Sequence, residues 1–105
     1  MARKLGLSSE DLVNAAAEIA DAEGLDAVTL ASVAGRLGVR PPSLYAHVDG
    51  LDGLRRLLAL RAAHAMGAAL REATEGWAGL EALRALSHGY RGFAREHPGL
   101  YAAAQ

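Results

Sequence analysis

Four side chains that could contact double-stranded nucleic acid lie within eight residues of one another: Arg40, Ser43, Tyr45 and His47. An arginine can bond bidentately to guanine, and a serine can bond to several base edges. The polar tips of tyrosine and histidine suit phosphate oxygens, and such contacts orient a protein without reading base sequence. This combination could therefore both position a protein on a duplex and read it.

The residues before this group predict a short helix. Thr29 is a good N-cap, because its hydroxyl can accept a hydrogen bond from the first turn. Apolar residues then recur at helical spacing and give the helix one apolar stripe: Leu30, Val33, Ala34 and Leu37. Gly38 follows the stripe, where a helix commonly ends in a left-handed residue.

A second short helix is predicted to begin at the two prolines. Arg40 precedes a proline and is pushed towards an extended conformation. Pro41 and Pro42 fit the first turn of a helix, where no N–H partner is needed. The helix would run to His47 with Leu44 facing inward. The stretch 29–48 is thus a predicted helix-turn-helix.

In a DNA-binding helix-turn-helix, the N-terminal residues of the second helix enter the major groove. The proline rings could contact a thymine methyl group there. Helix-turn-helix units without any DNA function are also common in helical proteins. Spacing alone therefore leaves both interpretations open.

Longer motifs favour the first interpretation. They are the A-A-x-x-I-A-x-x-E-G-L-D-A-V-T-L run that ends at Leu30, V-A-x-x-L-G-V from Val33, and S-L-Y-x-H-V from Ser43. In this order and spacing, the run from about Ser9 to Leu58 resembles the DNA-binding domain of the tetracycline-repressor (TetR) family of bacterial transcription regulators.

The resemblance implies that Tyr45 and His47 meet phosphates and that residues 40–43 meet bases. It also implies a homodimer on double-stranded DNA and a larger helical domain that binds a small-molecule effector. We accordingly expect a repressor that binds a palindromic operator. The candidate DNA-binding residues are Thr29, Arg40, Pro41, Pro42, Ser43, Tyr45 and His47.

The balance of acidic and basic residues argues against DNA binding. Residues 1–60 hold six basic and eight acidic side chains, whereas a nucleic-acid footprint is usually basic. Six of the acids fall on the first predicted helix or just after it, where they could form a solvated face away from DNA. At Leu51 the family often has a lysine. A helical interaction module that keeps the fold without strong DNA binding is therefore the alternative.

Composition and periodicity predict an all-α chain. A first helix would begin at Ser8 or Ser9, with Ser8 and Asp11 as a capping box, and end at Gly24. Asp49 could cap a long helix that reaches about Glu72, and a turn follows at 73–79. We expect residues 1–50 to form a three-helix helix-turn-helix domain. Residues 51–105 would form a linking helix and the start of a helical effector-binding domain.

The last third of the chain predicts two more helices. Leu80, Leu83, Leu86, Tyr90, Phe93 and Ala94 share one face of the first, and Pro98 ends it. The segment 90–101 resembles the opening of one type of effector domain in the same family. The remaining helices of such a domain do not follow, so we expect an exposed apolar face. His64, Trp77 and Tyr90 are the candidate effector-pocket residues.

The sequence gives little support for a metal site, a catalytic site or a membrane span. There is no cysteine, and no two histidines have the H-x-x-x-H spacing of a helical metal site. We find no nucleophile elbow, phosphate-cradling glycine loop or plausible pair of catalytic carboxylates. No apolar run approaches the length needed to cross a bilayer. We therefore expect a cytoplasmic protein that is not an enzyme and uses no cofactor or metal.

Overall fold

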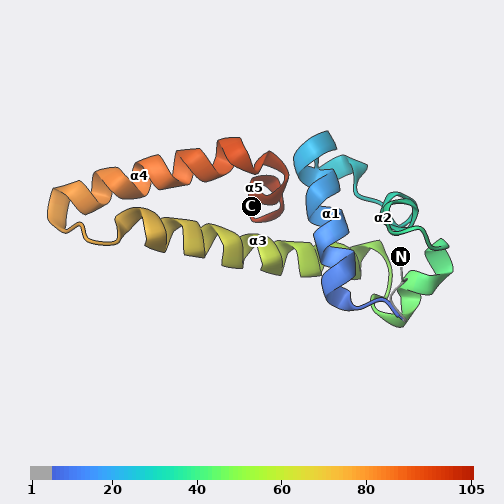
Figure 1. Ribbon diagram of the computed structural model, residues 1–105. Coiled ribbons are helices and arrows are strands. Elements are labelled where there is room, and N and C mark those ends of the chain that lie inside the picture. The colour runs from blue at the N-terminus through green and yellow to red at the C-terminus, as the bar shows by residue number, and fades with distance from the viewer. Residues whose placement is uncertain (1–5) are drawn as a thin grey trace.

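The computed structural model describes residues 6–105, and these residues form an all-α fold without strands, as the sequence predicts (Figure 1). Arg3 and Lys4, counted above among the basic residues, lie outside the described residues. The elements are α1 (Ser9–Glu23), the 3₁₀ helix η1 (Leu25–Ala27), α2 (Leu30–Leu37), the 3₁₀ helix η2 (Pro41–Ala46), α3 (Leu51–Thr74), α4 (Gly79–Glu96) and α5 (Pro98–Ala103).

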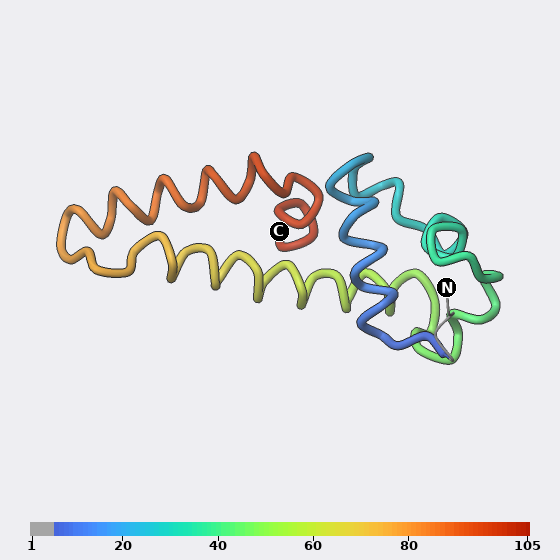
Figure 2. Tube along the Cα trace, in the orientation of Figure 1, coloured from blue at the N-terminus to red at the C-terminus, as the bar shows by residue number. Residues whose placement is uncertain are grey.

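The helices form an elongated molecule of 51 × 27 × 23 Å (Figure 2). α1, α2 and η2 gather around the first half of α3, whose second half runs on to pair with α4 in an antiparallel hairpin (Figure 1). The short α5 returns from the end of α4 and contacts both α1 and α3. It therefore joins the hairpin to the N-terminal helices.

α1 begins and ends at the residues that its sequence predicts. The Ser8 side chain accepts a hydrogen bond from the Asp11 backbone N–H at 3.2 Å, and the Asp11 carboxylate accepts one from the Ser8 N–H at 3.0 Å. This is the predicted capping box. Gly24 follows the helix with φ at 99°, a conformation that costs a glycine little.

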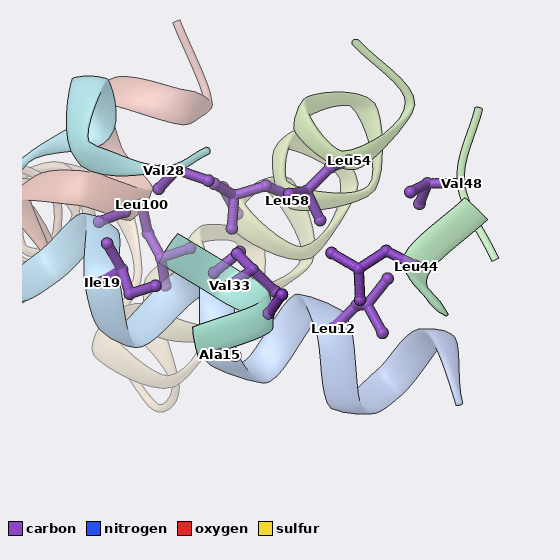
Figure 3. Packing of buried hydrophobic residues seen from close by; sticks show 14 of the residues in the cluster. Leu12, Ala15, Ile19, Val28, Val33, Leu44, Val48, Leu54, Leu58 and Leu100 are labelled. Atoms are coloured by element: carbon purple, nitrogen blue, oxygen red, sulfur yellow. The ribbon is translucent and has the colours of Figure 1, made fainter. Parts of the chain in front are cut away.

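The core is narrow and contains many alanines. Its four fully buried leucines are Leu12 on α1, Leu44 on η2, and Leu54 and Leu58 on α3. Val28, Val33, Ile19 and five alanines extend the cluster towards α5 (Figure 3). Because alanine side chains are short, α1, α2 and α3 can approach closely, but each alanine contact buries little apolar area.

The start of α3 differs from the prediction. Gly50, not Asp49, is the N-cap residue, and no side chain caps the helix. The Gly50 carbonyl accepts the first helical hydrogen bond, from the Leu54 N–H at 3.0 Å. The Asp49 side chain is exposed, and no hydrogen bond joins it to another described residue. The prediction that Asp49 caps this helix is wrong, because the chain turns one residue later than expected.

The apolar stripe of α4 is only partly covered. Phe93 is buried against the core, whereas Leu80, Leu83 and Leu86 are 66%, 59% and 39% exposed. The stripe therefore packs near α5 and opens to solvent towards the α3–α4 turn. An exposed apolar face on this helix is what the sequence predicts.

One carboxylate on α1 holds the start of α5. Asp21 Oδ1 accepts hydrogen bonds from the Gly99 and Leu100 backbone N–H groups, both at 3.0 Å. Its other oxygen, Oδ2, lies 2.7 Å from His97 Nδ1. Asp21 thus satisfies N–H groups that the first turn of α5 leaves unpaired. The expectation that the acids of α1 form only a solvated face is wrong for Asp21.

Close backbone packing occurs at the same junction. Gly99 is buried against α1, and a Cβ atom placed on it would overlap the backbone carbonyl of Ala20. Only a residue without a side chain fits between the two helices at this point. The sequence gives no local sign of this contact, since 78 positions separate Gly99 from Asp21 on the facing helix.

Asp21→Asn should destabilise the fold. Asparagine keeps one oxygen for the Gly99 and Leu100 N–H groups but loses the charge that strengthens these hydrogen bonds and the pairing with His97, so a loss of about 1–3 kcal/mol is expected. The measurement is the free energy of unfolding in urea. Asp26→Asn removes the same charge at an exposed position and serves as the control. Equal stability of the two variants would contradict the role given to Asp21.

Gly99→Ala should also destabilise the fold, by about 1–3 kcal/mol, because α5 must shift away from Ala20. Gly92→Ala is the matched control, since a Cβ there meets nothing within 4 Å. Gly92 lies within α4, so alanine should stabilise that helix by roughly 0.5–1 kcal/mol. Thermal unfolding of both variants tests whether the two substitutions change the stability in opposite directions. A stabilising effect of Gly99→Ala would disprove the close contact.

Candidate nucleic-acid interface

Thr29 and Ser32 fix the start of α2. The Thr29 hydroxyl accepts a hydrogen bond from the Ser32 N–H at 2.9 Å, and the Ser32 hydroxyl accepts one from the Thr29 N–H at 2.9 Å. The Ser32 side chain also lies 2.8 Å from the Ala27 carbonyl oxygen, to which it can donate. The predicted cap at Thr29 is confirmed, and Ser32 completes a reciprocal capping box that was not predicted.

The turn after α2 has the predicted geometry. Gly38 is left-handed, with φ at 74° and ψ at 29°, and the Val39 N–H donates to the Ala34 carbonyl at 2.9 Å. Arg40 is extended, with φ at −85° and ψ at 146°. The chain therefore leaves α2 sharply and enters the next helix at Pro41, as expected for a helix-turn-helix.

The second helix of the unit is a 3₁₀ helix. In η2 the Ser43 N–H donates to the Arg40 carbonyl and the His47 N–H to the Leu44 carbonyl, each at 2.9 Å. Two of its six residues are prolines, which have no N–H to donate. Short helices of this kind commonly take the tighter 3₁₀ form. The second helix exists where predicted, with a tighter winding than an α-helix.

One buried residue holds η2, and its neighbours face solvent. Leu44 is fully buried and is directed toward Leu12 of α1 (Figure 3). Tyr45 is 57% exposed, and His47 is half-buried. The other exposed residues of the segment are Arg40, Pro41, Pro42 and Ser43. All six candidate residues between positions 40 and 47 are therefore accessible on this short segment.

Several acids of α1 bind other parts of the fold. Glu18 accepts a hydrogen bond from Arg36 of α2 at 3.1 Å, and Glu10 accepts one from Arg61 of α3 at 2.9 Å. Asp11 and Asp21 cap helices, as described above. Between Val39 and Val48 the chain carries no carboxylate at all. The overall net charge is therefore a poor guide to the charge around η2.

Arg40 has no carboxylate partner within the described part of the chain, unlike Arg36. Its guanidinium is exposed and can turn towards a ligand. A planar guanidinium with five N–H donors matches the paired acceptors of guanine or the oxygens of a phosphate. The exposed end of η2 can therefore supply both a cation and neutral hydrogen-bond donors.

The three candidate effector-pocket residues lie in different surroundings on the α3–α4 hairpin. His64 lines a shallow hollow on α3 with Leu60 and Arg71, of about 230 Å³. Tyr90 lines a separate hollow of about 250 Å³ between α3 and α4. Trp77 lies in the turn between these helices and is 56% exposed. The hairpin does not enclose the three side chains in one cavity.

Tyr90 also contacts the next helix, α5. Its hydroxyl lies 3.4 Å from that of Tyr101 on α5, and the two rings meet edge to face with centroids 5.7 Å apart. The hydrogen bond between the hydroxyls raises the pKa of Tyr101 above its usual range. This pair links α4 to α5.

Residues 6–105 hold neither a metal cluster nor a membrane span. No group of three or more histidine, aspartate or glutamate side chains there could hold a metal ion. None of the helices in this range is both long and apolar enough to span a bilayer.

Comparison with known proteins gives two relatives that match nearly the whole chain. The "Uncharacterized HTH-type transcriptional regulator YobS" of Bacillus subtilis (strain 168) is 41% identical over 104 residues, which is 99% of this chain and 54% of that protein. The "Uncharacterized HTH-type transcriptional regulator Rv0681" of Mycobacterium tuberculosis (strain ATCC 25618 / H37Rv) is 38% identical over 103 residues, 98% of this chain and 47% of that protein.

The chain spans about half the length of the curated relatives it matches. No family model matches it. Both relatives are named as helix-turn-helix transcriptional regulators, and the chain is similar to them over all five α-helices. This similarity agrees with the helix-turn-helix built from α2 and η2.

Proposed function

We propose that the protein is a DNA-binding transcriptional regulator whose helix-turn-helix places η2 in the major groove. The observation that carries the proposal is the contrast within η2: Leu44 is fully buried, while Arg40, Ser43 and Tyr45 beside it are exposed. A segment anchored on one side and open on the other can present its N-terminal side chains to base edges. The names of both relatives support the same function.

Each candidate residue has a distinct role in this proposal. Arg40 and Ser43 bond to base edges, and the rings of Pro41 and Pro42 contact thymine methyl groups or sugar. Tyr45 and His47 contact phosphates. Thr29, whose hydroxyl already caps α2, acts mainly by fixing the direction of that helix.

The finer proposal is a ligand-responsive repressor of the TetR type that binds a palindromic operator as a homodimer. Residues 1–50 are then the DNA-binding domain, and α3, α4 and α5 begin an effector domain. Support comes from the family motifs, from relatives about twice as long as this chain, and from the hollows along the α3–α4 hairpin. His64, Trp77 and Tyr90 would face an effector. A thermal-shift panel on the full chain tests this part.

A binding assay with selected duplexes tests the main proposal. Duplexes enriched by the full chain from a random pool should bind at low salt more tightly than the unselected pool. The selected sites should contain two half-sites about one helical turn, or a multiple of it, apart. Equal affinity for the selected and random duplexes would reject the proposal. The alternative, a helical interaction module with a helix-turn-helix fold, would then account for the chain better.

Arg40→Ala and Tyr45→Phe should affect binding in different ways. Arg40→Ala should relax preference at one base position, at a cost of about 1–3 kcal/mol there. Tyr45→Phe removes only a hydroxyl and should weaken binding to all sequences alike, since a phosphate contact carries no base information. Binding across a library of site variants measures both effects. Identical profiles for the two variants would contradict the assigned roles.

A further inference from the structure

A notch at the base of η2 combines two groups that can bind an oxyanion. It is lined by His47, Val48, Asp49, Gly53, Arg56 and Leu57, and has a volume of about 190 Å³. One water occupies about 30 Å³ in the liquid, so a phosphate group fits in the notch. Gly53 lines the notch without a side chain, and a Cβ placed there would make an ordinary contact with the Cβ of Val48 at 3.5 Å.

Arg56 is a cation without a partner. It is exposed on the second turn of α3, and no ion pair or hydrogen bond joins its side chain to any other described residue. By contrast, Arg36 and Arg61 are both held by carboxylates of α1. A free guanidinium that shares a notch with an imidazole is well suited to a phosphate, since it offers parallel N–H donors to two oxygens.

We propose that the notch between His47 and Arg56 binds one backbone phosphate of duplex DNA, with Arg56 as the principal cation. This inference rests on the proposed function and adds a contact outside the helix-turn-helix, on the first half of α3. His47 at the end of η2 and Arg56 on α3 hold the phosphate from two elements. The contact therefore fixes how η2 is oriented in the groove.

Asp49 lies in the same notch and opposes an anion. Asp52, also exposed, lies one helical turn before Arg56 and adds a second negative charge nearby. Asp49 neither caps α3 nor bonds to another described residue, so no hydrogen bond or ion pair of the fold depends on its charge. Its removal should consequently strengthen the binding of a phosphate and lower the stability of the fold by no more than the small contribution of an acid beside a helix N-terminus.

The test measures the salt dependence of binding to a random-sequence duplex and to a selected duplex, with the full chain. Arg56→Gln should reduce the slope of log K against log salt concentration by about 1, and lower affinity roughly tenfold near 0.1 M salt. Both duplexes should be affected equally. Arg84→Gln is the control, because it removes the same charge at an exposed position on α4.

Two further variants test the charge at Arg56 and the opposing charge at Asp49. Arg56→Lys keeps the positive charge and should retain the slope. Asp49→Asn should raise affinity for both duplexes several-fold, with at most a small change in thermal unfolding, because it removes a like charge beside the phosphate. Circular dichroism of each variant checks that the helices are intact.

The outcomes separate this inference from the proposed function. A wild-type chain that binds no duplex at low salt rejects the proposed function, and the phosphate site with it. If the wild-type chain binds duplex DNA, but Arg56→Gln and Arg84→Gln show the same slope of log K against log salt concentration, the phosphate site alone is rejected. The phosphate site is also rejected if Arg56→Gln loses affinity only for duplexes that differ at one base position. It is rejected as well if Asp49→Asn binds duplex DNA no more tightly than the wild-type chain.

Discussion

The burial of Leu44 is the constraint on which the rest of the candidate interface depends. η2 is only six residues long, and a helix this short has little stability of its own. One fully buried leucine, worth about 1.5–3 kcal/mol of apolar burial, anchors it in the hydrophobic core, where it is directed toward Leu12 of α1 (Figure 3). Two prolines limit the backbone before that anchor, and Gly38 sets the angle of entry. The exposed side chains of η2 are therefore held in place by contacts that they do not make themselves.

The charges of the protein serve two separate purposes. On α1, carboxylates cap helices or pair with arginines of α2 and α3, which ties the three helices together. Asp21 extends the same arrangement to α5 and so connects α1 to the α3–α4 hairpin. Arg40 and Arg56 have no such partner and remain available to an anion. Around η2, where no carboxylate lies between Val39 and Val48, a chain with a net charge of −1 can accordingly present a locally cationic surface.

Local features of the fold could be predicted from the sequence, because their causes lie within a few residues. The Ser8 and Thr29 caps, the left-handed Gly38 and the inward Leu44 belong to this group. The cap at Asp49 was predicted wrongly, since one residue of difference in a turn moves the helix start. The contacts of Asp21 with α5 and the His47–Arg56 notch could not be predicted, because each joins elements whose separation depends on the packing of whole helices. The exposed positions of η2 followed from its sequence, whereas their roles on DNA remain predictions.

Hydrogen exchange in a Leu44→Ala variant of the full chain tests the central claim most directly. The His47 and Val48 amides, which both donate to the Leu44 carbonyl, should lose their protection, while amides in the middle of α1 and α3 stay protected. Affinity for a selected duplex should fall at least tenfold in the same variant. Native protection of His47 and Val48, together with unchanged affinity, would contradict the claim that Leu44 holds the interface in place.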